Sequence, residues 1–178
     1  MIFTEQALKG VVLISPEPHE DERGMLRRNF CEREFKAQGL MVDIKQSNIS
    51  ENLKAFTLRG FHYQFVPRQE DKVISCIRGS IYDIIVDMRP QSPTYLKWQA
   101  YELKDENRSS IYVPMGCANA YMTMKDNTWV SYFHSEFYSP GDEGGIRYDD
   151  EFFHFDWPAE PKVISERDLA HPPFRIDH

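Results

Sequence analysis

The sequence predicts an all-β fold, a sandwich or barrel of short strands with few helices. From Ile44 onward, runs rich in β-branched and aromatic residues alternate with turn residues at intervals of about ten positions. Aromatic residues make up 13% of the chain, a weight that favours strands and ring-lined pockets. With 178 residues, 41% of them hydrophobic, we expect a single domain over 1–178 around one core, which excludes disordered, coiled-coil and collagen-like classes.

The clearest local unit is a hairpin. Residues 72–77 and 81–88 have the composition of strands and flank a tight turn that contains Gly79. Pro90 ends the second strand, because proline cannot donate to a sheet ladder. Alternation along that strand puts one set of side chains on one face, Tyr82, Ile84, Val86 and Met88, and another on the opposite face, Asp83, Ile85 and Asp87. Further strands are predicted at 96–103, 110–113 and 128–133.

Helices are expected only at the periphery. Residues 32–38 predict one short helix that Gly39 terminates. Four prolines predict that 158–178 wraps as extended chain, with a single helical turn at 165–169.

Charge and cysteine usage exclude several classes of partner. The formal net charge is −7, and no run of Lys or Arg offers a footprint for nucleic acid or an anionic membrane. No secretory signal starts the chain, and no stretch approaches the ~18 apolar residues of a membrane span. The three cysteines, Cys31, Cys76 and Cys117, form no C-x-x-C pair, which favours a reducing compartment. We therefore expect a cytoplasmic protein with neither nucleic acid nor membrane as a partner.

Familiar cofactor and metal signatures are missing from the sequence. The nine glycines never fall as G-x-G, and neither a P-loop nor a G-x-S-x-G nucleophile elbow occurs. The six histidines show no H-x-H or H-x-x-x-H spacing, and Gln64 and Asn119 stand where a small metal-binding barrel often has further histidines. We expect no cofactor and no metal.

Several polar residues nevertheless lie in segments predicted as strands or tight loops. Each alone has an ordinary explanation as a solvated, hydrogen-bonded or rim residue, so a functional interpretation depends on the combination. The set is Arg23, Gln46, Asn48, Arg59, His62, Lys72 and Tyr132.

Motifs around these residues resemble those of the dTDP-4-dehydrorhamnose 3,5-epimerases, in the same order and spacing from Asp21 to about Asp168. They are D-E-R-G at 21–24, Q-S-N-I-S at 46–50, L-R-G-F-H-Y-Q at 58–64, D-K-V at 71–73, V-D-M-R at 86–89, S-P-T-Y at 92–95, P-M-G-C-A at 114–118, Y-S-P at 138–140 and W-P at 157–158. The resemblance implies a cupin-type jelly-roll barrel with short helices at the periphery. It also implies a homodimer that exchanges N-terminal strands, and a nucleotide-diphospho-4-keto-6-deoxyhexose substrate, above all dTDP-4-keto-6-deoxy-D-glucose.

The resemblance also implies roles for four residues. Inverting a carbon beside a ketone needs a base, a cation near the developing enolate and an acid on the opposite face. His62 is similar to the family base, and histidine is suited to that task near neutral pH. Asp168 resembles the carboxylate that orients it, Lys72 the lysine near the ketone oxygen, and Tyr132 the tyrosine thought to return a proton.

The resemblance implies that a further set of residues binds the substrate. Arg23 and Arg59 match family residues near the pyrophosphate, a task that suits bidentate guanidinium groups. Others assigned to substrate binding are Gln46, Asn48, Asn119, Tyr138, Glu143 and Arg28.

Three departures from the family pattern leave alternatives open. Asn119 stands where the family commonly has histidine, which allows epimerisation at C3 alone. Leu26 and Arg28 replace a Phe and a Glu of the thymine pocket, which allows a CDP- or GDP-linked sugar. His134 is predicted on the same face as Tyr132, as a second active-site imidazole or a rim residue. A non-catalytic nucleotide-sugar-binding cupin is the third alternative.

Overall fold

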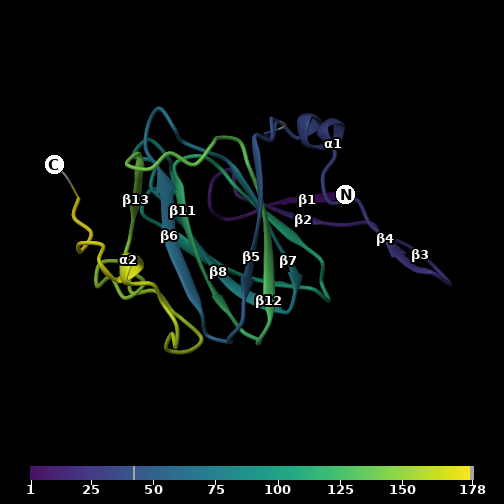
Figure 1. The fold of residues 1–178 in the computed structure, drawn as a ribbon. Coiled ribbons are helices and arrows are strands. Elements are labelled where there is room, and N and C mark those ends of the chain that lie inside the picture. Colours follow the sequence, from purple (N-terminus) through teal and green to yellow (C-terminus); the bar gives the residue numbers. More distant parts are fainter. Residues whose placement is uncertain (42, 177–178) are drawn as a thin grey trace.

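The computed structural model describes residues 1–41 and 43–176, and two antiparallel sheets that face each other form its body (Figure 1). The six-stranded sheet runs in the order β1 (Ile2–Glu5), β2 (Val12–Ser15), β10 (Ser110–Val113), β7 (Lys72–Arg78), β12 (Thr128–His134) and β5 (Gln46–Asn52). The five-stranded sheet runs in the order β13 (Glu143–Gly145), β6 (Leu58–Gln64), β11 (Cys117–Thr123), β8 (Ser80–Asp87) and β9 (Trp98–Lys104). The predicted all-β, cupin-type jelly-roll barrel is confirmed.

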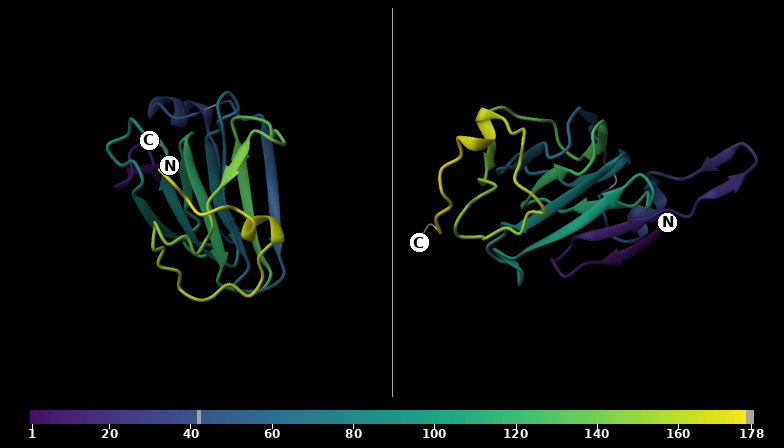
Figure 2. Two further views of the ribbon diagram at one scale, coloured as in Figure 1. Left: turned by 90° about the vertical axis from the view of Figure 1, so that its left-hand side faces the viewer. Right: turned by 90° about the horizontal axis from the view of Figure 1, so that it is seen from below.

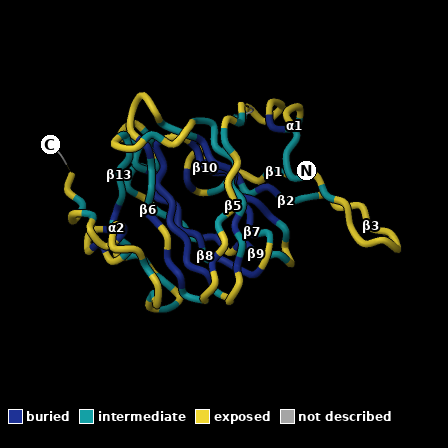
Figure 3. Tube along the Cα trace, viewed as in Figure 1, coloured by how far each residue is buried: buried dark blue, intermediate teal, exposed yellow. Residues whose placement is uncertain are grey.

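The main core lies between the sheets, where the strands are darkest in Figure 3. The predicted alternation along β8 is confirmed, because Ile85 faces this core while Ile84 and Val86 face a second cluster on the outside of the five-stranded sheet. Aromatic rings from the segment that leads into the C-terminal wrap, among them Phe153 and Phe155, cover that outer cluster together with Phe174 of the wrap itself. The wrap therefore packs firmly on the sheet that carries β6.

Both short helices form where the sequence predicts them. Helix α1 (Glu32–Ala37) is capped by Gln38 and followed by Gly39, whose φ of +70° is a conformation that glycine adopts without strain. Helix α2 (Glu166–Leu169) is the single turn predicted within the C-terminal wrap; residues 177 and 178 of that predicted segment lie outside the described residues. Neither helix of the described chain is long and apolar enough to cross a membrane.

A second hairpin, β3 (His19–Asp21) with β4 (Gly24–Leu26), stands out from the barrel (Figures 1 and 2). In the right-hand view of Figure 2 it extends from the end opposite the C-terminal segment. Within residues 1–41 and 43–176 its strands pair only with each other, and all of their residues are exposed. The strands β1 to β4 precede Ile44, so the pattern of strand-like runs from Ile44 onward did not include them. Apolar residues of β2 such as Val12 and Ile14 are buried, and this burial holds that strand in the sheet.

Candidate active site

A cleft of about 660 Å³ opens into the barrel. Its walls come from β5, β7 and β12 of one sheet, from β6, β11 and β13 of the other, and from residues 163–168 of the C-terminal wrap. Most of the sequence-predicted site residues line it: Asn48, Arg59, His62, Lys72, Asn119, Tyr132, Tyr138, Glu143 and Asp168.

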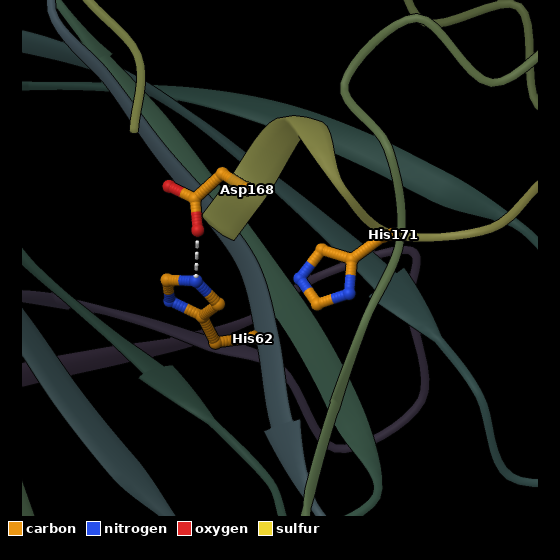
Figure 4. Close-up of side chains that lie close together, drawn as sticks. All are labelled: His62, Asp168 and His171. Carbon is orange, nitrogen blue, oxygen red and sulfur yellow. Dashed lines mark hydrogen bonds and ion pairs between the residues drawn. The ribbon is translucent and has the colours of Figure 1, made fainter. Parts of the chain in front are cut away.

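His62 and Asp168 form a hydrogen-bonded pair on one side of the cleft, with 2.7 Å between His62 Nε2 and Asp168 Oδ1 (Figure 4). The Asp168 side chain is buried and starts from α2, whose first turn Ser165 caps by accepting the Asp168 backbone N–H. Burial by itself raises the pKa of Asp168, but the hydrogen bond and the charge of His62 outweigh it and lower the pKa. Asp168 is therefore the acceptor, and His62 donates from Nε2.

This arrangement determines which nitrogen of His62 is free. A neutral imidazole carries one N–H, and the bond to Asp168 keeps it on Nε2, so the lone pair lies on Nδ1. The His62 side chain is 39% exposed, whereas that of Asp168 is 5% exposed. The imidazole is therefore accessible from the cleft while its partner is sealed behind it.

Lys72, at the start of β7, is buried and lies between several oxygen atoms. Its Nζ donates to the backbone oxygen of His62 at 3.1 Å and to Asn119 Oδ1 at 3.2 Å, and lies 3.5 Å from Glu70 Oε1. The ammonium group is thus held beside the dyad by three contacts. A fixed cation of this kind can stabilise an oxyanion that develops in the cleft.

Asn119 links Lys72 to a carboxyl group inside the barrel. Its Nδ2 donates to Asp83 Oδ1 at 3.1 Å, and Asp83 is fully buried. The second oxygen, Oδ2, has no hydrogen-bond partner among the described residues. Burial raises the pKa of Asp83 to about 7, against the opposing effects of Asn119 and Lys72.

Tyr132 approaches the cleft from β12, on the sheet opposite to His62. Burial, followed by the neighbouring Tyr121, raises the pKa of the Tyr132 phenol well above its usual range. The phenol therefore stays protonated and can serve as a proton donor. His134 stacks on the Tyr132 ring at 5.6 Å, which confirms that both share a face.

His134 is also bound to an acidic neighbour. Its Nδ1 lies 2.8 Å from Glu70 Oε2, and Glu70 contacts Lys72 as well. Burial alone raises the pKa of Glu70, but His134 and Lys72 together lower it, so Glu70 is ionised. The pair places His134 in the wall of the cleft as a neighbour of the lysine.

Three predicted substrate-binding residues lie near strand β5. Arg59 is exposed on β6 and donates from Nε to Asn52 Oδ1 at 2.7 Å, and its two terminal nitrogens form no hydrogen bond with the described residues. Gln46 is not among the lining residues; it donates to Asn48 Oδ1 at 3.2 Å and accepts the backbone N–H of Tyr138 at 3.3 Å. Gln46 thus positions its neighbours.

Two more predicted residues meet at the cleft opening. The Tyr138 hydroxyl donates to Glu143 Oε1 at 2.8 Å, and Arg167 forms an ion pair with the same carboxylate. Burial raises the pKa of Glu143, but the hydrogen bonds from Arg167 and Tyr138 lower it overall. The cluster connects β13 to α2, the helix that carries Asp168.

The structure does not bring Arg23 and Arg28 to the cleft of their own chain. The Arg23 side chain is 84% exposed on the projecting hairpin and pairs with Asp21 at 2.5 Å. Arg28 pairs with Glu34 of α1 and lines a smaller hollow beside Met1. Neither residue contacts a side chain of the cleft.

Four cleft or near-cleft residues have roles that sequence reasoning missed: Glu70, Asp83, Tyr121 and Arg167. Glu70 and Arg167 directly adjoin motifs that were singled out, so their position was a usable signal. Asp83 and Tyr121 sit in strands next to apolar residues. The pairing of β8 with β11 brings Asp83 to Asn119, and the packing of one sheet on the other brings the Tyr121 ring within 6.4 Å of the Tyr132 ring.

Comparison with known proteins gives consistent matches along most of the chain. A family model described as dTDP-4-dehydrorhamnose 3,5-epimerase matches residues 5–175. The dTDP-4-dehydrorhamnose 3,5-epimerase of Methanothermobacter thermautotrophicus is 37% identical over 176 residues, 97% of this chain and 94% of the relative. A crystal structure of the Bacillus anthracis enzyme with TDP and PPi bound has a TM-score of 0.94 at 30% identity, covering 97% of this chain and 99% of that chain. A dTDP-4-dehydrorhamnose 3-epimerase of Streptomyces niveus is 32% identical over 162 residues, 90% of this chain and 78% of the relative.

Proposed function

Because the chain belongs to the dTDP-4-dehydrorhamnose 3,5-epimerase family, we propose that it inverts C3 and C5 of dTDP-4-keto-6-deoxy-D-glucose. One observation carries this proposal. The hydrogen-bonded pair of His62 and Asp168 lies on one side of the cleft, and Tyr132 lies on the opposite side, on the other sheet. The reaction needs a base and an acid on opposite faces of one carbon, and this arrangement supplies both.

In the proposed mechanism, His62 Nδ1 takes the proton from a carbon next to the ketone. The electron pair of the broken C–H bond moves onto the ketone oxygen, and Lys72 stabilises the resulting enolate. A single positioned donor of this kind contributes roughly 2.7–4 kcal/mol to the transition state by analogy with oxyanion holes. Tyr132 then returns a proton to the opposite face, which inverts the carbon. No step requires a cofactor, because the ketone already acidifies its neighbours.

Substrate binding would depend on the polar groups around the cleft. Arg59 offers a guanidinium group for the pyrophosphate, and Asn48, Tyr138 and Glu143 offer hydrogen bonds farther along the cleft. The related B. anthracis structure holds TDP and PPi, which supports a thymidine nucleotide. Thermal shifts with dTDP, CDP, GDP and UDP would test this preference, since the nucleotide that binds stabilises the folded state.

We further propose a homodimer in which the hairpin of β3 and β4 crosses to the partner chain and supplies Arg23 to its cleft. The hairpin exposes Leu26 at 74%, a costly arrangement for an isolated chain. Mixing Arg23→Ala and His62→Asn subunits tests this exchange. If Arg23 acts across the dimer, each mixed dimer regains one intact site; if it acts within its own chain, both sites stay damaged and no activity returns.

A C3-only epimerase is the second candidate, favoured by Asn119 and by the S. niveus relative with that activity in its name. Proton NMR in deuterated water with dTDP-4-keto-6-deoxyglucose separates the two. Deuterium at both C3 and C5 supports the 3,5-epimerase, whereas deuterium at C3 alone supports the second candidate. The proposed location is the cytoplasm, and the free thiols of Cys31, Cys76 and Cys117 suit its reducing conditions.

A further inference from the structure

We propose that His62, Asp168 and His171 form a binding site for Zn²⁺, and that the bound ion switches off the proposed base. One ligand atom from each of the three side chains lies within 4.8 Å of the others. Figure 4 shows His62 and Asp168 joined by their hydrogen bond, with the ring of His171 beside them. Two imidazoles and one carboxylate are a common ligand set of open zinc sites, which keep a fourth position for water.

His171 is the residue that adds a third ligand to the dyad. It follows α2, its ring lies against Gly145, and the ring centroids of His171 and His62 are 6.5 Å apart. One edge of the ring faces His62 in Figure 4. The buried Nε2 of His171 has no hydrogen-bond partner among the described residues, and leaving a buried polar group unsatisfied destabilises the fold. A metal ion would satisfy this nitrogen.

The position of His171 also suits a ligand. Its Nε2 is buried beside the dyad and bonded to none of the described residues, so its lone pair is available to a metal ion. Asp168 accepts the hydrogen bond of His62 and so offers a carboxylate, and the nearby charges of Arg167 and Glu143 neutralise each other in an ion pair. The three ligands therefore bring one negative charge to a divalent cation.

Only small movements are needed to bind the ion. Zn²⁺ holds nitrogen and oxygen at about 2.0–2.2 Å, which puts tetrahedral ligand atoms about 3.3 Å apart. His62 Nε2 and Asp168 Oδ1, now 2.7 Å apart, would separate slightly, and His171 would move inward. The sequence shows no metal-binding spacing because His62 lies on β6 and His171 beyond α2; the fold, not the local motif, brings them together.

Coordination would block the proposed base by moving one proton. Zn²⁺ replaces the hydrogen on His62 Nε2, and the single proton of the neutral imidazole then resides on Nδ1. Nδ1 is the nitrogen that must be free to accept the substrate proton. The ion would therefore inhibit the epimerase without taking part in its chemistry.

Calorimetric titration of the whole chain with zinc alone tests the site without any substrate. We expect one Zn²⁺ per chain, and an affinity lower by about tenfold or more in His171→Phe, which keeps a ring but removes both nitrogens. The matched control is His154→Asn, at an exposed histidine with a φ of 49° that asparagine tolerates. Should His171→Phe not fold, His171→Gln takes its place. Equal zinc affinity in wild type and in a folded His171 variant would overturn the proposal.

A second readout rests on the proposed function. Zinc should slow the incorporation of deuterium into the substrate by the wild type, and a chelator should restore the rate. In the His171 variant, zinc should leave the rate close to that of the same variant without zinc. If calorimetry shows the expected zinc binding but the wild type has no epimerase activity, the metal site stands and the proposed function fails. If the wild type is active and zinc inhibits both proteins equally, the metal site fails.

Discussion

Asn119 Nδ2 lies 3.1 Å from Oδ1 of Asp83, a carboxyl group that solvent does not reach. This bond fixes which way the amide points, and the amide oxygen consequently faces Lys72. A histidine at this position could carry a proton, whereas the asparagine can only position its neighbours through hydrogen bonds. Asp83 thus positions the ammonium group through Asn119.

The first prediction concerns stability and pH at Asp83. Its pKa is raised from 3.8 to about 7 in the folded chain, so the folded state holds a proton that the unfolded state releases. The corresponding stability is present below the unfolded pKa and is lost as pH rises through about 7. Denaturant unfolding across this range should show a weaker pH dependence for Asp83→Asn than for wild type. The exposed Asp156→Asn is the control, and identical slopes for all three proteins would refute the prediction.

Removing the charge of Asp168 should slow the reaction with little change in fold. Asp168→Asn keeps the shape of the side chain but no longer holds the N–H of His62 on Nε2, so Nδ1 loses its preference as base. We expect kcat to fall by about 10²- to 10⁴-fold. Glu166→Gln, an exposed neighbour on α2, should retain the wild-type rate. Equal rates for Asp168→Asn and Glu166→Gln would show that the dyad is unimportant.

Tyr132→Phe should separate proton removal from inversion. The ring still stacks on His134, but the acid on the opposite face is gone. Deuterium should therefore still enter the substrate from the His62 face, while net inversion falls by about 10²-fold or more. Tyr121→Phe, which removes a hydroxyl bonded to Ser50, is the neighbouring control and should affect inversion less. Undiminished inversion in Tyr132→Phe would exclude it as the acid.

Gly60 explains why the motif around His62 requires glycine. Its φ is +109°, and a Cβ here would lie 2.6 Å from the Asn119 backbone oxygen and 2.8 Å from Ala120 Cα. Gly60→Ala should lower the free energy of unfolding by about 2 kcal/mol or more, because both strain and a clash with β11 are imposed. Gly141→Ala has a similar φ of +91° but open space around it, so it should cost less. Equal melting temperatures for the two variants would contradict the clash.

One family motif proves to be structural. Asp87, in the V-D-M-R segment, accepts hydrogen bonds from Arg89, Ser92 and Thr94, and Arg89 also donates to the Lys9 backbone oxygen. These bonds close the turn after β8 and fasten the N-terminal segment. Both this motif and the one around His62 carry the resemblance to the family, so a sequence alone does not separate a structural motif from a catalytic one.

The predictability of the fold and the site differs for physical reasons. Alternation along β8 was readable because its two faces meet different apolar clusters, and α1 was readable because Gly39 marks its end. Contacts between strands could not be predicted from the sequence, because the approach of Asp83 to Asn119 depends on the register of β8 and β11. The position of Arg23 follows from a hairpin that this barrel does not bind, and no pattern within one chain could place it.

The most direct test of the central claim, that His62 is the base, is deuterium incorporation at C3 and C5 of dTDP-4-keto-6-deoxyglucose by His62→Asn. The variant should melt like wild type and incorporate no deuterium at either carbon, because asparagine cannot accept the proton. Incorporation at the wild-type rate by the folded variant would contradict the assignment of His62 and with it the mechanism.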